Sequence, residues 1–197
     1  IGQMEIQKLA SRFSPVCQFK YMVDMTTGQI YSHNGHSNTL NPIRTQEGSL
    51  RVIDIVNRVG KGKQNIVYCN ARVKVVKYAK DYADSILPDA VDKKYKEKLE
   101  SLAKDIRNEV HSACFLAELV QKGVAYHVGY LPASIRLRIE EGFKDGMIRT
   151  MFCTSTLVEG VNLPADNLFI TSYKNGRSDM NEVEFRNLVG RVGRIQY

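Results

Sequence analysis

The sequence predicts one α/β domain with a mostly parallel sheet, preceded by a small antiparallel region. From residue 49 onward, short apolar runs of strand length alternate with longer segments of helical periodicity. The chain has 197 residues, enough for one such domain with a real core and too few for two ordinary domains. Hydrophobic residues make up 43% and charged residues 25%, which is ordinary for a globular domain.

The N-terminal part contains one expected hairpin. Residues 1–16 are polar and mixed, and we expect a linker or the tail of a preceding element there. The stretch 17–34 alternates around Thr-Thr-Gly, which predicts a β-hairpin. Polar residues, Gly and Pro dominate residues 33–48, which predicts a loop. The expected division is therefore 1–16, a hairpin and loop at 17–48, and a βα core at 49–197.

The βα core begins with a helix at 49–62, which Ser49 can cap and in which Leu50, Ile53, Val56 and Val59 form one stripe. Further helices are expected at residues 71–87, 92–110, 112–123, 132–146 and 181–191. Strands are expected at residues 65–69, 123–128, 147–155 and 167–173. Apolar side chains at helical spacing mark two buried helix faces: Leu99, Leu102, Ile106 and Val110, and Ile135, Ile139 and Phe143.

Composition narrows the class of protein. No apolar run reaches the ~18 residues of a membrane span, so we expect no membrane partner. The start has no signal peptide and no initiator Met, which predicts an excised piece. Four separated cysteines without CxxC spacing predict buried free thiols in a reducing, cytoplasmic compartment, with disulfides or zinc as the alternatives. A net charge of +7 fits a polyanionic partner without proving one.

The sequence lacks a complete phosphate-binding loop. A P-loop requires G-x-x-x-x-G-K-[ST], and the nearest stretch, RVGKGKQN at residues 58–65, has neither the first Gly nor a Ser or Thr after Lys. A helix C-terminus with solvated lysines explains that stretch. There is also no DExD/H box for magnesium, so the chain by itself cannot assemble a nucleoside triphosphate site. We predict no resident metal.

The stretch TSTLVEGVNLPADNLFI at residues 154–170 follows a predicted strand. Small hydroxyl side chains at the carboxyl end of a strand, next to backbone N–H groups of a helix start, suit phosphate oxygens. A polar turn follows before Pro164. From local chemistry alone, a capped helix start followed by a turn remains the alternative.

The stretch VGRVGR near the C-terminus places Arg191 and Arg194 one helical turn apart between glycines. Both guanidinium groups can therefore face one ligand, and the glycines allow close backbone approach. Two such cations suit a triphosphate during phosphoryl transfer. A solvated basic helix end, favoured by the helix dipole, is the alternative.

The order of these motifs resembles the second RecA-like lobe of superfamily-2 DExH helicases, closest to the branch of archaeal repair helicases and exosome-associated RNA helicases. NIVYCNAR resembles motif IV, the run from GVAYHV to VNLPA resembles motifs IVa and V, and NLVGRVGR resembles motif VI. The resemblance covers residues 17–197 and implies a three-layer RecA-like domain of the P-loop NTPase type.

The resemblance implies roles for individual residues. Arg191 and Arg194 match the catalytic arginines that reach the ATP γ-phosphate across a cleft between two lobes. Nucleotide contacts are implied for three motif V residues, Glu159, Gly160 and Asn162. Contacts with the backbone of a nucleic-acid strand are implied for a larger set: Asn70, Ala71, Arg72, His127, Gly129, Thr154, Ser155 and Thr156.

Some positions depart from the family pattern. Asn187 stands where the family often has Gln, and Val192 replaces a small Ala. The stretch around His127 has one His where relatives often have two, and an extra residue before Leu-Pro. Arg136 is interpreted as structural, pairing with Glu140 one turn later.

The expected function is therefore the second motor lobe of an ATP-dependent helicase or translocase moving 3′ to 5′ on single-stranded DNA or RNA. The cofactors are ATP and Mg²⁺, and the ion and the P-loop are expected on an N-terminal RecA-like lobe of the same protein. This chain alone is expected to be inactive. The alternatives are a non-catalytic nucleic-acid or protein-binding module, and a translocase without unwinding, because no strand-separating wedge is recognisable in the sequence.

Overall fold

The computed structural model describes residues 18–34, 37–45, 49–87, 91–155, 163 and 165–190. Its strands are β1 (Lys20–Val23), β2 (Gln29–Asn34), β3 (Thr39–Thr45), β4 (Asn65–Tyr68), β5 (Val124–His127), β6 (Thr150–Cys153), β7 (Asn167–Ile170), β8 (Lys174–Asn175) and β9 (Ser178–Asp179). Its helices are α1 (Val52–Val59), α2 (Arg72–Asp84), the 3₁₀ turn η2 (Lys93–Tyr95), α3 (Lys96–Glu109), α4 (Leu116–Gln121), α5 (Ala133–Lys144) and α6 (Glu182–Val189).

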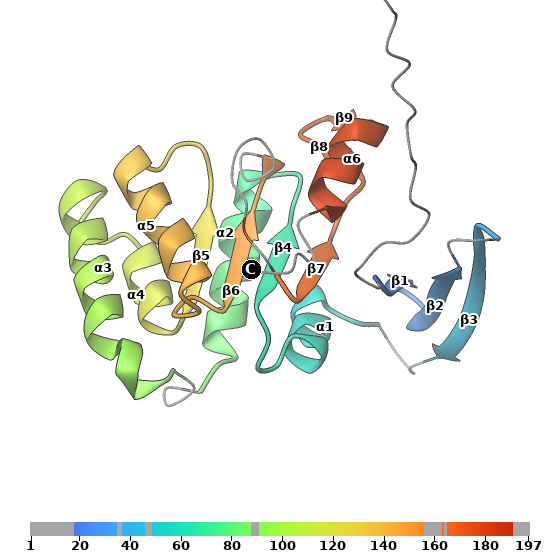
Figure 1. The fold of residues 1–197 in the computed structure, drawn as a ribbon, viewed down its shortest axis with the longest axis horizontal. Helices are drawn as coiled ribbons and strands as arrows, with labels where there is room; N and C mark the ends of the chain where they lie inside the picture. Colours follow the sequence, from blue (N-terminus) through green and yellow to red (C-terminus); the bar gives the residue numbers. More distant parts are fainter. Residues whose placement is uncertain are drawn as a thin grey trace, which may run out of the picture.

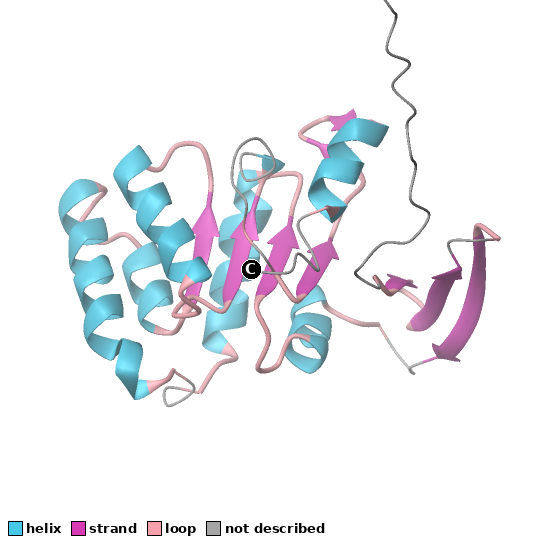
Figure 2. Cartoon of the chain, in the orientation of Figure 1, coloured by secondary structure: helices cyan, strands magenta, loops and turns pink. Residues whose placement is uncertain are grey.

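The central sheet has the strand order β5-β6-β4-β7, and all of its pairs are parallel. The four arrowheads point to one edge, at the top of Figures 1 and 2. The last residues of three strands are aligned at that edge, since Tyr68 of β4 lies opposite both Cys153 of β6 and Ile170 of β7. The predicted mostly parallel α/β sheet is therefore confirmed, and the segments that follow the four strands meet at one edge.

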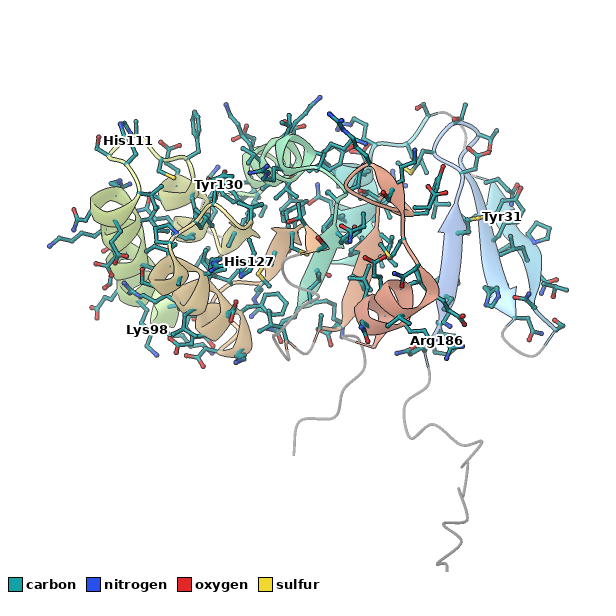
Figure 3. All side chains as sticks on the ribbon, turned by 90° about the horizontal axis from the view of Figure 1, so that it is seen from above. Tyr31, Lys98, His111, His127, Tyr130 and Arg186 are labelled. Carbon is teal, nitrogen blue, oxygen red and sulfur yellow. The ribbon has the colours of Figure 1, made fainter. Side chains whose placement is uncertain are left out.

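Helices cover both faces of this sheet. In the view from above, α2 lies on one side and α5 and α6 lie on the other (Figure 3). Helix α4 packs on β5 and α2, on the α2 side, while α3 packs against α4 and α5 at the β5 end. No helix among the described residues is long and apolar enough to cross a membrane.

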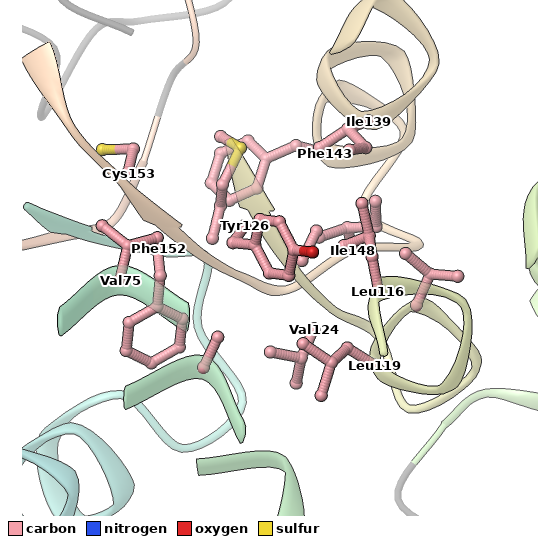
Figure 4. Packing of buried hydrophobic residues seen from close by; sticks show 14 of the residues in the cluster. Val75, Leu116, Leu119, Val124, Tyr126, Ile139, Phe143, Ile148, Phe152 and Cys153 are labelled. Carbon is pink, nitrogen blue, oxygen red and sulfur yellow. The ribbon is translucent and has the colours of Figure 1, made fainter. Parts of the chain in front are cut away.

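The core forms because the three strands β4, β5 and β6 are buried along their whole length and carry apolar side chains at most positions. Both faces of such strands meet helices, which explains their continuous apolar runs. Figure 4 shows Ile139 and Phe143 of α5 and Leu116 and Leu119 of α4 around β5. Strand β7, at the edge of the sheet, is only half-buried. The expected stripe in α3 is confirmed for Leu99, Leu102 and Ile106, which are buried, whereas Val110 at the C-cap is half-buried.

A buried polar network closes the amino-terminal edge of the sheet. The Asn65 amide Nδ2 donates to the carbonyl oxygens of Gly60 and Lys63 at 2.9 and 3.0 Å, and lies 3.2 Å from Thr150 Oγ1. Asn167 Nδ2 donates to Asn65 Oδ1 at 3.0 Å, and Thr150 Oγ1 lies 3.2 Å from Tyr82 Oη. These groups satisfy one another inside the fold, as buried polar groups must.

The first helix departs from the prediction in two ways. Arg51 takes the N-cap position, while the Ser49 hydroxyl donates to the carbonyl of Met25 instead. The stripe holds for Ile53 and Val56, which are buried, but Val59 is 56% exposed because it lies in the last turn, at the end of the helix.

The N-terminal part forms a three-stranded antiparallel sheet, in which β2 pairs with both β1 and β3. The expected hairpin is confirmed as β1 and β2. The loop predicted for residues 33–48 is wrong in part, because Thr39–Thr45 form β3. The loop was predicted because this segment contains Pro42. A strand can still form there, because β3 lies at the edge of the sheet, where a residue without an N–H group is tolerated.

The prediction of free thiols is confirmed for the three cysteines that the structure describes. Cys69, Cys114 and Cys153 are free, and burial raises the pKa of the Cys69 thiol. Cys17 lies outside the described residues.

Candidate nucleic-acid interface

The carboxyl-terminal edge of the sheet brings together three of the predicted segments. Asn70 and Arg72 follow β4, Gly129 follows β5, and Thr154 and Ser155 follow β6. Because β5, β6 and β4 are neighbours in the sheet, these segments lie side by side along the edge. Thr154 and Ser155 are half-buried and follow the middle strand of the three.

Helix α2 begins at this edge and presents positive charge. Its N-cap residue Ala71 makes no side-chain cap, and its first turn has no acidic residue. Backbone N–H groups and the positive end of the helix dipole are therefore available there to an anion. Arg72 is exposed at the first helical position, and Lys74 and Lys77 are exposed within the next two turns.

Helix α5 begins at the same edge, after β5. Pro132 occupies its N-cap position without a side-chain hydrogen bond, and its first turn contains no acid. The Gly129 and Tyr130 positions just before it are exposed, and the Tyr130 side chain is 52% exposed. Two helix N-termini thus point toward one strip of surface, which is a favourable arrangement for phosphate groups.

Asn70 holds an element that the sequence analysis missed. Its Nδ2 donates to the carbonyl of Gly176 at 3.2 Å, in the turn of the β8–β9 hairpin. The Tyr68 hydroxyl donates to the carbonyl of Lys174 at 2.8 Å, and burial raises its pKa to about 12, so it remains a donor. Gly176 has a φ of +61°, which suits the first position of a two-residue hairpin turn. In the sequence, this Gly between polar residues was the signal from which the hairpin turn could have been predicted.

One polar atom at this edge is left over. Asn70 Oδ1 is buried and has no hydrogen-bond partner in the described part of the chain. An unpaired buried acceptor costs free energy, so such atoms are expected where a donor from a ligand or another part of the protein completes the arrangement.

His127 occupies a different environment from its neighbours. Its ring is 2% exposed (Figure 3). Its Nε2 lies 2.8 Å from Oε1 of Glu140 on α5. Burial lowers the pKa of His127 although Glu140 opposes this effect. A contact between this imidazole and a nucleic-acid strand is therefore blocked in this conformation, and the pair instead fixes β5 to α5 beneath the Gly129 loop.

The expected Arg136–Glu140 pair is wrong. Glu140 bonds to His127, and Arg136 Nε is buried without a hydrogen-bond partner among the residues that the structure describes. The helical spacing of four residues allowed the pair, but the buried imidazole across the helix–sheet boundary takes the carboxylate. The spacing of residues in the sequence cannot show that His127 and Arg136 compete for the Glu140 carboxylate.

The remaining predicted site residues lie outside the described residues: Thr156, Glu159, Gly160, Asn162, Arg191 and Arg194. Ser155 and the fully buried Leu163 flank the first four of them. Gly190, which caps α6, precedes the two arginines. Within the described ranges, no group of three or more His, Cys, Asp or Glu side chains could hold a metal ion.

Comparison with known proteins places the chain in a family. Residues 83–196 match the family described as the helicase conserved C-terminal domain. The chain is 33% identical over 158 residues to the ATP-dependent DNA helicase Hel308 of Pyrobaculum calidifontis, covering 75% of this chain and 22% of the relative.

Two further relatives give the same picture. The ATP-dependent DNA helicase Hel308 of Caldivirga maquilingensis is 32% identical over 148 residues, covering 71% of this chain and 19% of the relative. The probable ATP-dependent DNA helicase HFM1 of Xenopus tropicalis is 29% identical over 151 residues, covering 75% and 11%. The chain thus spans about a fifth or less of the length of these relatives.

Proposed function

Because the chain belongs to the helicase conserved C-terminal domain family, as a superfamily-2 C-terminal lobe close to the Hel308 branch, we propose that it is the second motor lobe of an ATP-dependent DNA helicase or translocase. In this proposal a first lobe of the same polypeptide holds the P-loop and Mg²⁺. ATP binding closes the two lobes, hydrolysis reopens them, and alternating grip moves a single strand, 3′ to 5′ as the family resemblance implies.

One observation carries the proposal beyond family membership. Half-buried hydroxyl side chains after β6, an exposed arginine after β4 and two acid-free helix N-termini share one edge of the sheet. Such a strip favours a row of phosphates, which gives binding that does not depend on base sequence. Relatives named as DNA helicases favour DNA as the track.

The roles proposed for Arg72, Gly129, Thr154 and Ser155 follow from their position along this strip, and those of the other residues follow from the family resemblance. Arg72 and the N-terminus of α2 bind one phosphate, and Thr154, Ser155 and Thr156 bind the backbone next to it. Gly129, without a side chain, lets the strand approach the N-terminus of α5. Glu159, Gly160 and Asn162 contact the nucleotide, and Arg191 and Arg194 stabilise the charge that develops on its γ-phosphate.

The direct test is ATP hydrolysis by the full-length protein, alone and with single-stranded DNA or single-stranded RNA. We expect hydrolysis to rise strongly with DNA. Stimulation by RNA alone would still support a nucleic-acid motor, but one that moves on RNA instead of DNA. A complete lack of hydrolysis under all three conditions would contradict the motor and favour a non-catalytic binding module.

The present chain supplies a matched control. Purified alone, it is expected to show no ATP hydrolysis, because it has no P-loop. Clear turnover by this chain would contradict the assignment of the phosphate site to a separate lobe.

A further inference from the structure

We propose that Tyr130 is a stacking platform for one base of the single strand, at the carboxyl-terminal edge of the central sheet. The proposal deepens the proposed function and rests on it, because the phosphates of that strand are assigned to the same edge. Tyr130 is not among the residues for which the family resemblance implies a contact, so its role is argued from the structure alone.

The Tyr130 side chain lies on the side of the sheet that α2 and α4 cover. Tyr126 of β5 directs its hydroxyl group to the start of α4, where its oxygen lies 3.8 Å from Cys114 Sγ. Burial raises the pKa of Tyr126, and the nearby Cys114 and Tyr130 side chains raise it further, so Tyr130 lies beside the same hydroxyl. In the view from above, Tyr130 accordingly lies toward α2 and α4, whereas His127 lies toward α5 (Figure 3).

A tight turn holds Tyr130 in place while leaving its ring in water. The backbone N–H of Leu131 donates to the carbonyl of Val128 at 3.2 Å, and both of these residues are buried. Gly129 and Tyr130 are the two central residues of this turn and are exposed, Tyr130 to 52%. An aromatic ring that is held in this way loses little conformational freedom on binding, so it can stack on a ligand at a low entropic cost.

Cations and a second aromatic ring share this side of the sheet. The first nine residues of α2 contain no acid and carry four exposed cations: Arg72, Lys74, Lys77 and Lys80. Phe115, the residue after Cys114, is 51% exposed, and Lys80 Nζ lies 4.7 Å from the centroid of its ring. Exposed acids appear farther along the two helices, at Asp81, Asp84 and Glu118. The surface next to Tyr130 therefore combines positive charge with exposed aromatic rings.

This combination identifies the occupant as a base of a nucleic-acid strand. An aromatic ring accepts any base, because every base has a π-face, and cations beside the ring bind the backbone. An apolar protein surface would instead leave these cations without partners, which costs free energy. Gly129 directly precedes Tyr130, so a phosphate at the N-terminus of α5 brings the base of the same nucleotide within reach of the ring.

Stacking and phosphate binding change different measurements. Loss of a phosphate contact lowers the dependence of affinity on salt concentration, because fewer counterions are released on binding. Loss of a stacked base lowers the affinity and leaves that dependence unchanged, because no ion is involved. A stacking residue also distinguishes a normal nucleotide from an abasic one, which has the same phosphate and no base.

The test compares three variants of the full-length protein with the wild type: Tyr130→Ala, Tyr130→Phe and the control Tyr21→Ala. Tyr21 is 60% exposed on β1, outside the central sheet. Both positions are exposed, so the variants are expected to fold, and thermal unfolding checks this. The affinity for an oligo-dT strand is measured over a range of salt concentrations, and again for strands in which one abasic nucleotide is placed at successive positions.

We expect Tyr130→Ala to weaken binding about 5- to 150-fold with an unchanged salt slope, the value of one base stacked on an aromatic ring. Tyr130→Phe should keep most of the affinity because it keeps the ring, and Tyr21→Ala should equal the wild type. One abasic position should weaken binding by the wild type and have little effect on binding by Tyr130→Ala.

Three results would overturn the stacking role: wild-type affinity in Tyr130→Ala, an equal loss in Tyr130→Phe and Tyr130→Ala, or the same sensitivity to abasic positions in Tyr130→Ala and the wild type. If the wild type binds the strand and hydrolyses ATP, any of these results refutes the stacking role alone. A wild-type protein that neither binds a single strand nor hydrolyses ATP refutes the motor, and the stacking role with it.

Discussion

The two edges of the central sheet treat polar side chains in opposite ways. At the amino-terminal edge, Asn65 is 1% exposed, and its amide groups bond to the Gly60 loop, to Thr150 and to Asn167. At the carboxyl-terminal edge, Asn70 keeps a buried oxygen without a hydrogen-bond partner among the residues that the structure describes, and Arg72 lies exposed. Asparagine at the start of β4 thus closes one edge, and asparagine just after β4 leaves the other edge incomplete.

This difference separates stability from function. A closed polar network contributes to folding, and removing a member leaves its partners unpaired. An incomplete edge contributes little to folding and leaves polar groups for a ligand. Parallel α/β sheets bind their ligands at the carboxyl ends of the strands, in agreement with this division. Substitutions at the two edges should therefore change different measurements.

The largest effect is expected for Arg194→Ala in the full-length protein. Removal of an arginine finger should lower the rate of ATP hydrolysis by ~10³-fold or more, with the thermal unfolding midpoint unchanged. Arg186→Ala is the control, because Arg186 is exposed on α6 and pairs with Glu182 one turn away, a contact of small energetic value. Near-normal hydrolysis by Arg194→Ala would mean that another group stabilises the γ-phosphate.

A matched pair of asparagine substitutions tests the two edges directly. Asn65→Ala should lower the free energy of unfolding by about 2–4 kcal/mol, because it leaves several buried groups unpaired. Asn70→Ala should lower it by less than about 1 kcal/mol, because one of its two amide atoms has no partner to lose in the described part of the chain. Urea unfolding of both variants measures the difference, and equal losses would remove the distinction between the edges.

His127 tests whether a residue at the carboxyl-terminal edge can belong to the core. Burial places its folded pKa below 6.5, so the unfolded chain takes up the proton first as the pH falls. Its contribution to stability is therefore present above pH 6.5 and is lost below it, at up to about 1.4 kcal/mol per pH unit. Urea unfolding between pH 7.5 and 5 should show a flatter dependence in His127→Gln. An unchanged slope would assign the acid sensitivity to other groups.

The sequence predicted the βα core well because its signals are local. Apolar runs such as residues 66–69 are buried on both faces, and the spacing of Ile135, Ile139 and Phe143 marks the buried side of one helix. Strand β3 was missed because its Pro suggested a loop, and β8–β9 because two-residue strands have almost no periodicity.

The candidate site was predicted as segments rather than as side-chain geometry. Strand order brings Asn70, Gly129 and Thr154 to one edge, as parallel βα units require. Which side chain is buried depends on partners distant in sequence. The ring of His127 bonds to Glu140 on α5, and Asn70 bonds to Gly176, and no local pattern specifies either contact.

The most direct measurement is the affinity of the full-length protein for a single-stranded DNA oligonucleotide, measured over a range of salt concentrations for Arg72→Ala. Lys98→Ala is the control, since Lys98 is exposed near the start of α3 (Figure 3). The account predicts that Arg72→Ala weakens binding several-fold and lowers the slope of log affinity against log salt by about 0.7, the loss of one phosphate contact. An affinity and slope equal to those of the wild type and of Lys98→Ala would contradict the assignment of the carboxyl-terminal edge to the nucleic-acid strand.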